Sequence, residues 1–119
     1  KLIVLHCTSS YPCNSKDLNL PKINILKKYF KNVGFSDHSL GINAGKIAAT
    51  YNISYIKKHF TINNNLPGRD NKFAILPKEL KELKDFYSFY EEANKFRGLN
   101  YLKSEREARK LYRGRWGKV

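Results

Sequence analysis

Histidines and small polar residues follow each of three predicted strands in this 119-residue chain. The clusters are His6 to Tyr11, Ser36 to His38 and His59 to Asp70, and they contain all three histidines of the chain. The carboxyl ends of parallel strands meet at one edge of a sheet, so we expect the clusters to converge. A single histidine at a strand end is more often structural, but three in equivalent positions favour a shared site.

His38 and His59 follow neighbouring predicted strands. Two imidazoles in such positions can hold a divalent ion and leave coordination positions open for water and substrate. An ion bound to a carbonyl oxygen stabilises the negative charge that develops during attack on that carbonyl. The pair therefore predicts a metal site that acts as a Lewis acid.

Short apolar runs alternate with stretches of helical periodicity along most of the chain. The expected elements are strands at residues 2–5, 33–35 and 53–61 and helices at residues 20–30, 42–51 and 78–96. Parallel strands of this kind need helices on both faces of an open sheet or around a closed barrel. A (β/α)8 TIM barrel takes about 250 residues. About three βα units in residues 1–96 therefore predict an α/β fold that is a terminal piece of such a barrel.

The chain carries 23 Lys and Arg against 10 Asp and Glu, a formal net charge of +13. Its 41% hydrophobic residues argue against a disordered basic tail. Residues 97–119 form a separate basic tail or linker in which Tyr101, Tyr112 and Trp116 alternate with lysines and arginines. Such a mixture can bind phosphates and stack on bases, so a nucleic-acid-binding module is an alternative function. The linker interpretation is favoured, and nucleic acid is not the expected partner.

Neither a long apolar run nor a charged-then-apolar leader is present, so we expect a cytoplasmic protein with no membrane partner. Cys7 and Cys13 match no zinc or disulfide pattern and are interpreted as ordinary reduced thiols. The chain contains no methionine and opens directly on an apolar run. We therefore expect it to be a trimmed or partial product of a longer protein.

Several consecutive motifs resemble the second half of the sialic acid synthase (N-acetylneuraminate synthase) family, in order and in spacing. The resemblance covers about residues 1–95, and the segments that carry it are His6–Pro12, Gly34–Gly41, Lys58–Thr61, Pro67–Asp70 and Leu76–Glu79. It implies the C-terminal half of a (β/α)8 barrel. The implied enzyme is a transferase that condenses phosphoenolpyruvate with N-acetylmannosamine, a related acylamino-sugar or its 6-phosphate, and releases phosphate.

The resemblance also implies roles for individual residues. His38 and His59 match the family's metal-binding histidines, which usually hold manganese or magnesium. Ser36 matches a position that contacts phosphoenolpyruvate, and Ser9 stands where some members carry an asparagine on the same side. Tyr11 and Asp70 match positions that contact the acceptor sugar. A carboxylate suits sugar hydroxyls because it accepts their hydrogen bonds.

The chain departs from the family near the second histidine. Lys57 stands where the family commonly has a glutamate, which reverses the charge beside the predicted metal. The family also uses lysines and a catalytic carboxylate from the first half of the barrel, and a later domain reaches the partner subunit's site. The expected partners are therefore the missing N-terminal half and, for the full protein, a second copy in a homodimer. We expect this chain alone to be inactive, and a degenerate, non-catalytic barrel piece is the remaining alternative.

Overall fold

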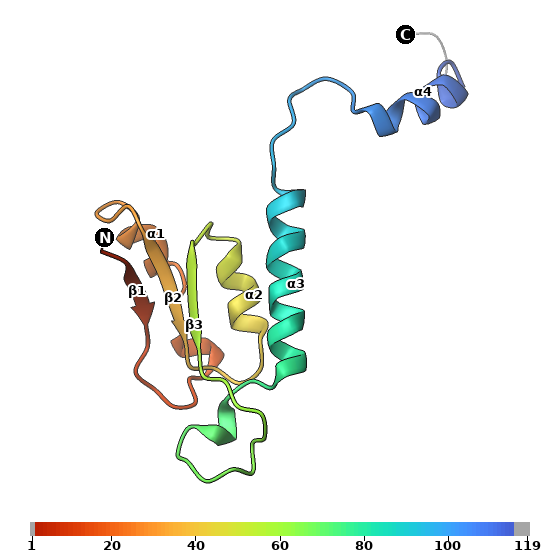
Figure 1. The fold of residues 1–119 in the computed structure, drawn as a ribbon. Coiled ribbons are helices and arrows are strands. Elements are labelled where there is room, and N and C mark those ends of the chain that lie inside the picture. The colour runs from red at the N-terminus through yellow and green to blue at the C-terminus, as the bar shows by residue number, and fades with distance from the viewer. Residues whose placement is uncertain (1, 116–119) are drawn as a thin grey trace.

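The computed structural model describes residues 2–115, which form a three-stranded parallel sheet followed by a helical tail (Figure 1). The strands are adjacent in chain order, β1-β2-β3. The elements are β1 (Val4–Cys7), α1 (Lys22–Leu26), β2 (Val33–Asp37), α2 (Asn43–Ala49), β3 (Tyr55–Lys58), α3 (Pro77–Ala93) and α4 (Arg106–Tyr112), with single 3-10 turns at Ser15–Asp17, Asn71–Phe73 and Lys103–Glu105. The predicted alternation of parallel strands and helices is confirmed.

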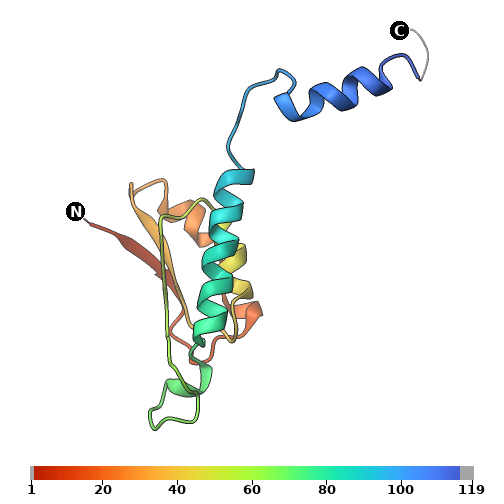
Figure 2. The same ribbon diagram turned by 45° about the vertical axis from the view of Figure 1, so that its right-hand side comes forward.

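Side chains along β2 point alternately to the two faces of the sheet. Val33 and Phe35 are buried against Ile23 of α1 and against Ala44 and Ala48 of α2. The helix α3 extends this layer, because its Leu83 is buried with Ile42 and Ile75. Helices α1, α2 and α3 therefore cover the same face of the sheet (Figures 1 and 2), and we call it the helix face. The opposite face, here the open face, has no helix over it among residues 2–115.

Gly34 lies in the middle strand, β2, on the open face, opposite Leu5 of β1 and Tyr55 of β3. A Cβ atom at Gly34 would lie 2.3 Å from the Tyr55 carbonyl oxygen and 2.7 Å from a Leu5 methyl carbon. No side chain fits at those distances, so glycine is required for the three strands to approach one another here.

Strand ends differ from the predictions by a few residues. β1 begins later than expected, at Val4, and runs to Cys7, while β2 continues through Ser36 to Asp37. The predicted helix at residues 20–30 is regular only over Lys22–Leu26. The strand shifts have one reason: pairing with a neighbouring strand, which the local apolar pattern does not contain, fixes where each strand ends.

Beyond β3, a parallel bridge joins Phe60 to Ile75. The Ile75 N–H donates to the His59 carbonyl over 2.9 Å, and the Thr61 N–H donates to the Ile75 carbonyl over 3.0 Å. These bonds hold together the two ends of the loop at residues 61–74, which carries the third predicted polar cluster. The loop is thereby anchored at its base to the edge of the sheet.

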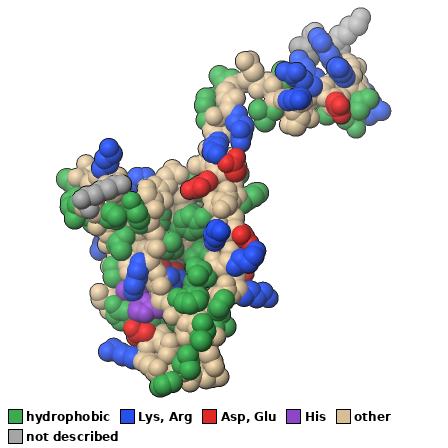
Figure 3. Space-filling view, in the orientation of Figure 1, with side chains coloured by type: hydrophobic (Ala, Val, Ile, Leu, Met, Phe, Trp, Pro, Cys, Tyr) green, Lys and Arg blue, Asp and Glu red, His purple; other side chains and the backbone are tan. Residues whose placement is uncertain are grey.

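The tail extends away from the sheet beyond the end of α3 (Figures 1 and 2). Lysine and arginine side chains gather on it (Figure 3), and all of its described residues are exposed. Trp116, which the sequence grouped with this tail, lies outside the described residues. Among residues 2–115, no helix combines the length and the apolar character that crossing a membrane requires.

Candidate functional site

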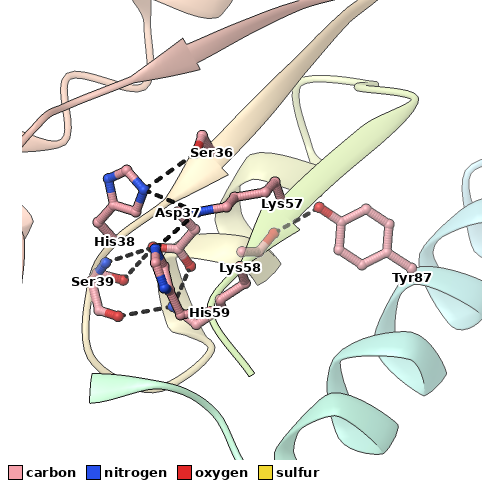
Figure 4. Close-up of polar contacts among 9 residues, drawn as sticks. Ser36, Asp37, His38, Ser39, Lys57, Lys58, His59 and Tyr87 are labelled. Atoms are coloured by element: carbon pink, nitrogen blue, oxygen red, sulfur yellow. Dashed lines mark hydrogen bonds and ion pairs between the residues drawn. The ribbon is translucent and has the colours of Figure 1, made fainter. Parts of the chain in front are cut away.

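The site lies on the open face, at the carboxyl ends of β2 and β3 (Figure 4). Ser36 of β2 pairs in register with Lys57 of β3. His38 and His59 each follow two residues later, so the period of two residues places them on the same face. Parallel pairing therefore brings together a hydroxyl, an amine and two imidazoles.

The two histidines lie side by side, with their ring centroids 5.4 Å apart. Lys57 reaches both rings: its Nζ atom is 2.8 Å from His59 Nε2 and 3.5 Å from His38 Nε2. An ammonium group has only donors, so both Nε2 atoms accept from it. The structure therefore brings His38 and His59 together, and their shared role stays a prediction.

Contacts at the other ring nitrogen fix the tautomer of His38. Its Nδ1 lies 3.0 Å from the Thr8 carbonyl oxygen, which only accepts hydrogen bonds, so Nδ1 carries the proton. The Cys7 sulfur is a more distant neighbour of the same nitrogen, at 3.8 Å. On the Nε2 side, the Ser36 hydroxyl lies 3.4 Å away. His38 therefore presents an unprotonated Nε2 to Ser36 and Lys57.

His59 is arranged in the same way. Its Nδ1 lies 3.5 Å from a carboxylate oxygen of Asp70. Burial lowers the pKa of His59 from its ordinary value, the Lys57 ammonium lowers it further, and Asp70 opposes the shift. The lowered pKa favours the neutral ring, whose Nε2 accepts from Lys57 while Nδ1 faces Asp70.

Tyr11 forms an aromatic wall of the site. Its ring centroid is 4.3 Å from that of His38 and 6.3 Å from that of His59. An open cavity of about 350 Å³ lies beside these rings. It is lined by Tyr11, Lys57, His59, Arg69 and Asp70. Histidine, acidic and basic side chains accordingly meet at the surface on the side shown in Figure 3.

A second polar cluster lies behind the site, on the helix face. The Lys58 Nζ atom is 2.8 Å from Asp37 Oδ2, and it also donates to the Ser39 carbonyl over 2.8 Å. The other carboxylate oxygen of Asp37 accepts from the Ser39 N–H and hydroxyl, at 2.8 and 2.7 Å. Asp37 and Lys58 are each one residue from a site histidine, so this pair positions His38 and His59. Sequence reasoning missed this role, although the period of two along β2 separates Asp37 from Ser36 and His38.

His6 does not belong to the site, and this corrects the expectation that all three histidines converge. Its register partner is Phe35, a helix-face residue, and it is 5% exposed. Its Nε2 lies 2.7 Å from the Leu18 carbonyl oxygen. The physical reason is that β1 extends to Cys7, which places His6 inside the strand and on the opposite face.

The remaining predicted residues divide between the site and its surroundings. Tyr11, Ser36 and Asp70 lie at the site. Ser9 is exposed in the loop after β1, and within residues 2–115 no hydrogen bond joins its side chain to the site. Both cysteines are free thiols, Cys7 exposed and Cys13 buried.

Residues 1–97 match the NeuB family, and the chain belongs to that family. It is 42% identical over 83 residues to N,N'-diacetyllegionaminic acid synthase of Legionella pneumophila, covering 69% of this chain and 23% of the relative. It is 41% identical over 88 residues to the spore coat polysaccharide biosynthesis protein SpsE of Bacillus subtilis, covering 71% of this chain and 24% of that protein. The chain thus spans about a quarter of the length of these relatives.

Solved structures give the same assignment. The N-acetylneuraminic acid synthetase of Leptospira borgpetersenii, solved with citrate, matches with a TM-score of 0.77 and 34% identity. That match covers 98% of this chain and 41% of the other. The α/β fold of the chain, a parallel sheet with helices, is therefore that of a synthase with a TIM-barrel-like architecture.

The donor set at the two histidines does not fit a divalent ion. Both Nε2 lone pairs, which a metal would need, accept from the Lys57 ammonium. The nearby carboxylate, Asp70, faces Nδ1 of His59 instead. Within residues 2–115, no group of three histidine, cysteine, aspartate or glutamate side chains lies close enough to hold a metal. The manganese or magnesium site therefore stays a sequence prediction.

Proposed function

We propose that this chain supplies part of the active site of a synthase that condenses phosphoenolpyruvate with an acylamino-sugar, consuming water and releasing phosphate. N-acetylmannosamine, a related sugar or its 6-phosphate is the proposed acceptor, and a nine-carbon sugar acid is the product. Membership of the NeuB family supports a condensation in sugar-acid biosynthesis. The proposal depends most on one observation: Ser36, His38, Lys57 and His59 meet at the carboxyl ends of parallel strands, beside a cavity.

The side chains that line this cavity suit both proposed substrates. Lys57 and Arg69 supply positive charge for the carboxylate and phosphate of phosphoenolpyruvate. Ser36 adds a hydroxyl donor on the β2 side, next to His38. Asp70 and Tyr11 line the same cavity and suit the hydroxyl groups of a sugar. Both substrates would then bind in one cavity, and carbon–carbon bond formation requires such proximity.

The tail gives less support to the nucleic-acid alternative. The Arg109 guanidinium lies 3.7 Å from the centre of the Tyr101 ring, and that of Arg115 lies 5.0 Å from the centre of the Tyr112 ring. These arginines cover aromatic faces that bases would otherwise stack on. We therefore propose the linker role for residues 97–119.

Titration of phosphoenolpyruvate into the chain, followed by phosphorus NMR with a chelator present, tests the proposal. We expect saturable binding that Lys57→Met and Ser36→Ala weaken, the first by about tenfold because a charge-assisted hydrogen bond is lost. Lys84→Met removes an exposed lysine of α3 and is the matched control. Absence of binding by the folded wild type, or equal binding by wild type and Lys57→Met, contradicts the proposal.

A further inference from the structure

Lys57 occupies the point toward which the site histidines direct their lone pairs. Its Nζ atom lies 2.8 Å from His59 Nε2 and 3.5 Å from His38 Nε2. The lysine belongs to β3, and its register with Ser36 of β2 places it beside both rings. The contacts therefore follow from the pairing of the strands as well as from the conformation of one side chain.

The Nδ1 edge of each ring faces another acceptor. His38 Nδ1 lies 3.0 Å from the Thr8 carbonyl oxygen, and His59 Nδ1 lies 3.5 Å from Asp70. Each ring therefore has only its Nε2 lone pair to offer. Turning a ring to present Nδ1 instead would break these contacts. The ammonium and a divalent ion consequently compete for the same two lone pairs.

The positive charge of Lys57 also opposes the binding of a divalent ion between the rings. A doubly charged ion between the rings would lie within about 4 Å of the Lys57 ammonium, and like charges at such a distance repel strongly at a partly buried site. The described residues place no carboxylate between the rings to offset this repulsion, because Asp70 faces the opposite edge of His59. A lysine that bound the ion as a neutral amine would first have to lose its proton.

We infer that the Lys57 ammonium takes the place of a divalent cation between His38 and His59, so that this site binds its anionic ligand with a fixed organic cation and excludes Mn²⁺ and Mg²⁺. An ammonium has three N–H donors. Two are directed to the imidazoles, and the third is left for a carboxylate or phosphate oxygen in the cavity of about 350 Å³ that Lys57 lines. The histidines in turn position Lys57, a role different from metal ligation.

Titration of Mn²⁺ alone into the 119-residue chain tests this inference. Binding is followed by the loss of the free Mn²⁺ signal in electron paramagnetic resonance and by broadening of the His38 and His59 ring signals in NMR. We compare the wild type with Lys57→Met, which removes the charge, and with Lys57→Glu, which also adds an oxygen ligand. Lys84→Glu, exposed on α3, makes the same change in net charge and is the matched control.

We expect no saturable binding by the wild type or by Lys84→Glu. Removing the like charge should tighten Mn²⁺ binding by about tenfold or more in Lys57→Met, with a further gain in Lys57→Glu. Saturable binding by the wild type at His38 and His59 with the affinity of Lys57→Met overturns the inference. Equally weak binding by all four proteins also overturns it, because Lys57 would then not be what excludes the ion.

The wild-type titration decides the question if a Lys57 variant does not fold. Saturable broadening of both ring signals by Mn²⁺ overturns the inference, and unbroadened signals in the folded chain support it. No substrate is present in this experiment, and no metal is present in the phosphoenolpyruvate titration. Failure of the inference is therefore distinguishable from failure of the proposed condensation.

Discussion

Lys57 and Lys58 are neighbours in the chain, yet they belong to two different parts of the molecule. Lys58 lies on the helix face, where its side chain is 5% exposed and pairs with a fully buried Asp37. Lys57 lies on the open face, where it is exposed and contacts two imidazoles. One step along the strand thus separates a buried lysine that holds the structure together from an exposed lysine that contacts two histidines. The faces of the sheet, rather than the residue types, assign the roles.

Substituting Lys57 and Lys58 in turn should give the largest difference in the free energy of unfolding between the two faces. Lys58→Met leaves the Asp37 carboxylate buried without its partner, and we expect a loss of about 3–5 kcal/mol in the free energy of unfolding. Lys57→Met removes an exposed charge, and we expect a change within about 0.5 kcal/mol. Guanidinium denaturation followed by far-UV circular dichroism measures both.

The double variant Asp37→Asn/Lys58→Met sharpens this comparison. It removes both buried charges, so we expect it to be more stable than Lys58→Met alone. Equal losses from Lys57→Met and Lys58→Met would show that the two faces do not differ in the way that we describe.

The histidines offer a second, smaller test of the same difference. His6→Phe keeps an aromatic ring against Phe35 but leaves the buried Leu18 carbonyl without its donor, and we expect a loss of about 1–3 kcal/mol. His59→Phe, its counterpart on the open face, should cost less stability. Thermal unfolding of both variants checks this order, and a reversed order would contradict the placement of His6 in the core.

Tyr87 of α3 provides the smallest expected effect. Its hydroxyl donates to the Gly45 carbonyl over 3.0 Å, so Tyr87→Phe should cost about 0.5–1.5 kcal/mol at neutral pH. Burial, and then the Asp37 charge, raises the pKa of Tyr87 from 10.0 to about 12. The folded state therefore holds this proton more tightly than the unfolded state does, and stability is lost as pH rises from about 10 toward 12.

Denaturation of wild type and Tyr87→Phe at neutral pH and across this alkaline range measures both effects. We expect the difference in stability between the two proteins to shrink as the pH rises. A difference that stays constant with pH would contradict the raised pKa of Tyr87.

Local sequence patterns were sufficient to predict the order of strands and helices and the meeting of His38 with His59. They were insufficient to assign side chains to the two faces of the sheet, because that assignment requires knowing the residues at which each strand begins and ends. The apolar run placed the first strand at residues 2–5. Pairing with β2 extends this strand to Cys7, so the His6 side chain points into the core. The charge reversal at Lys57 was visible in the sequence, but its position between two Nε2 atoms depends on the register with β2.

The paired ends of the loop at residues 61–74 divide the residues of the site into two groups, those on the loop and those on the strands. The backbone bonds at Ile75 hold the base of the loop, so residues at its tip can be exchanged, added or lost without disturbing β3. Arg69 and Asp70 belong to that loop, whereas Lys57 and the two histidines lie on or next to the paired strands. Substitutions in the loop can therefore reshape the cavity while the contacts between Lys57 and the two histidines stay in place.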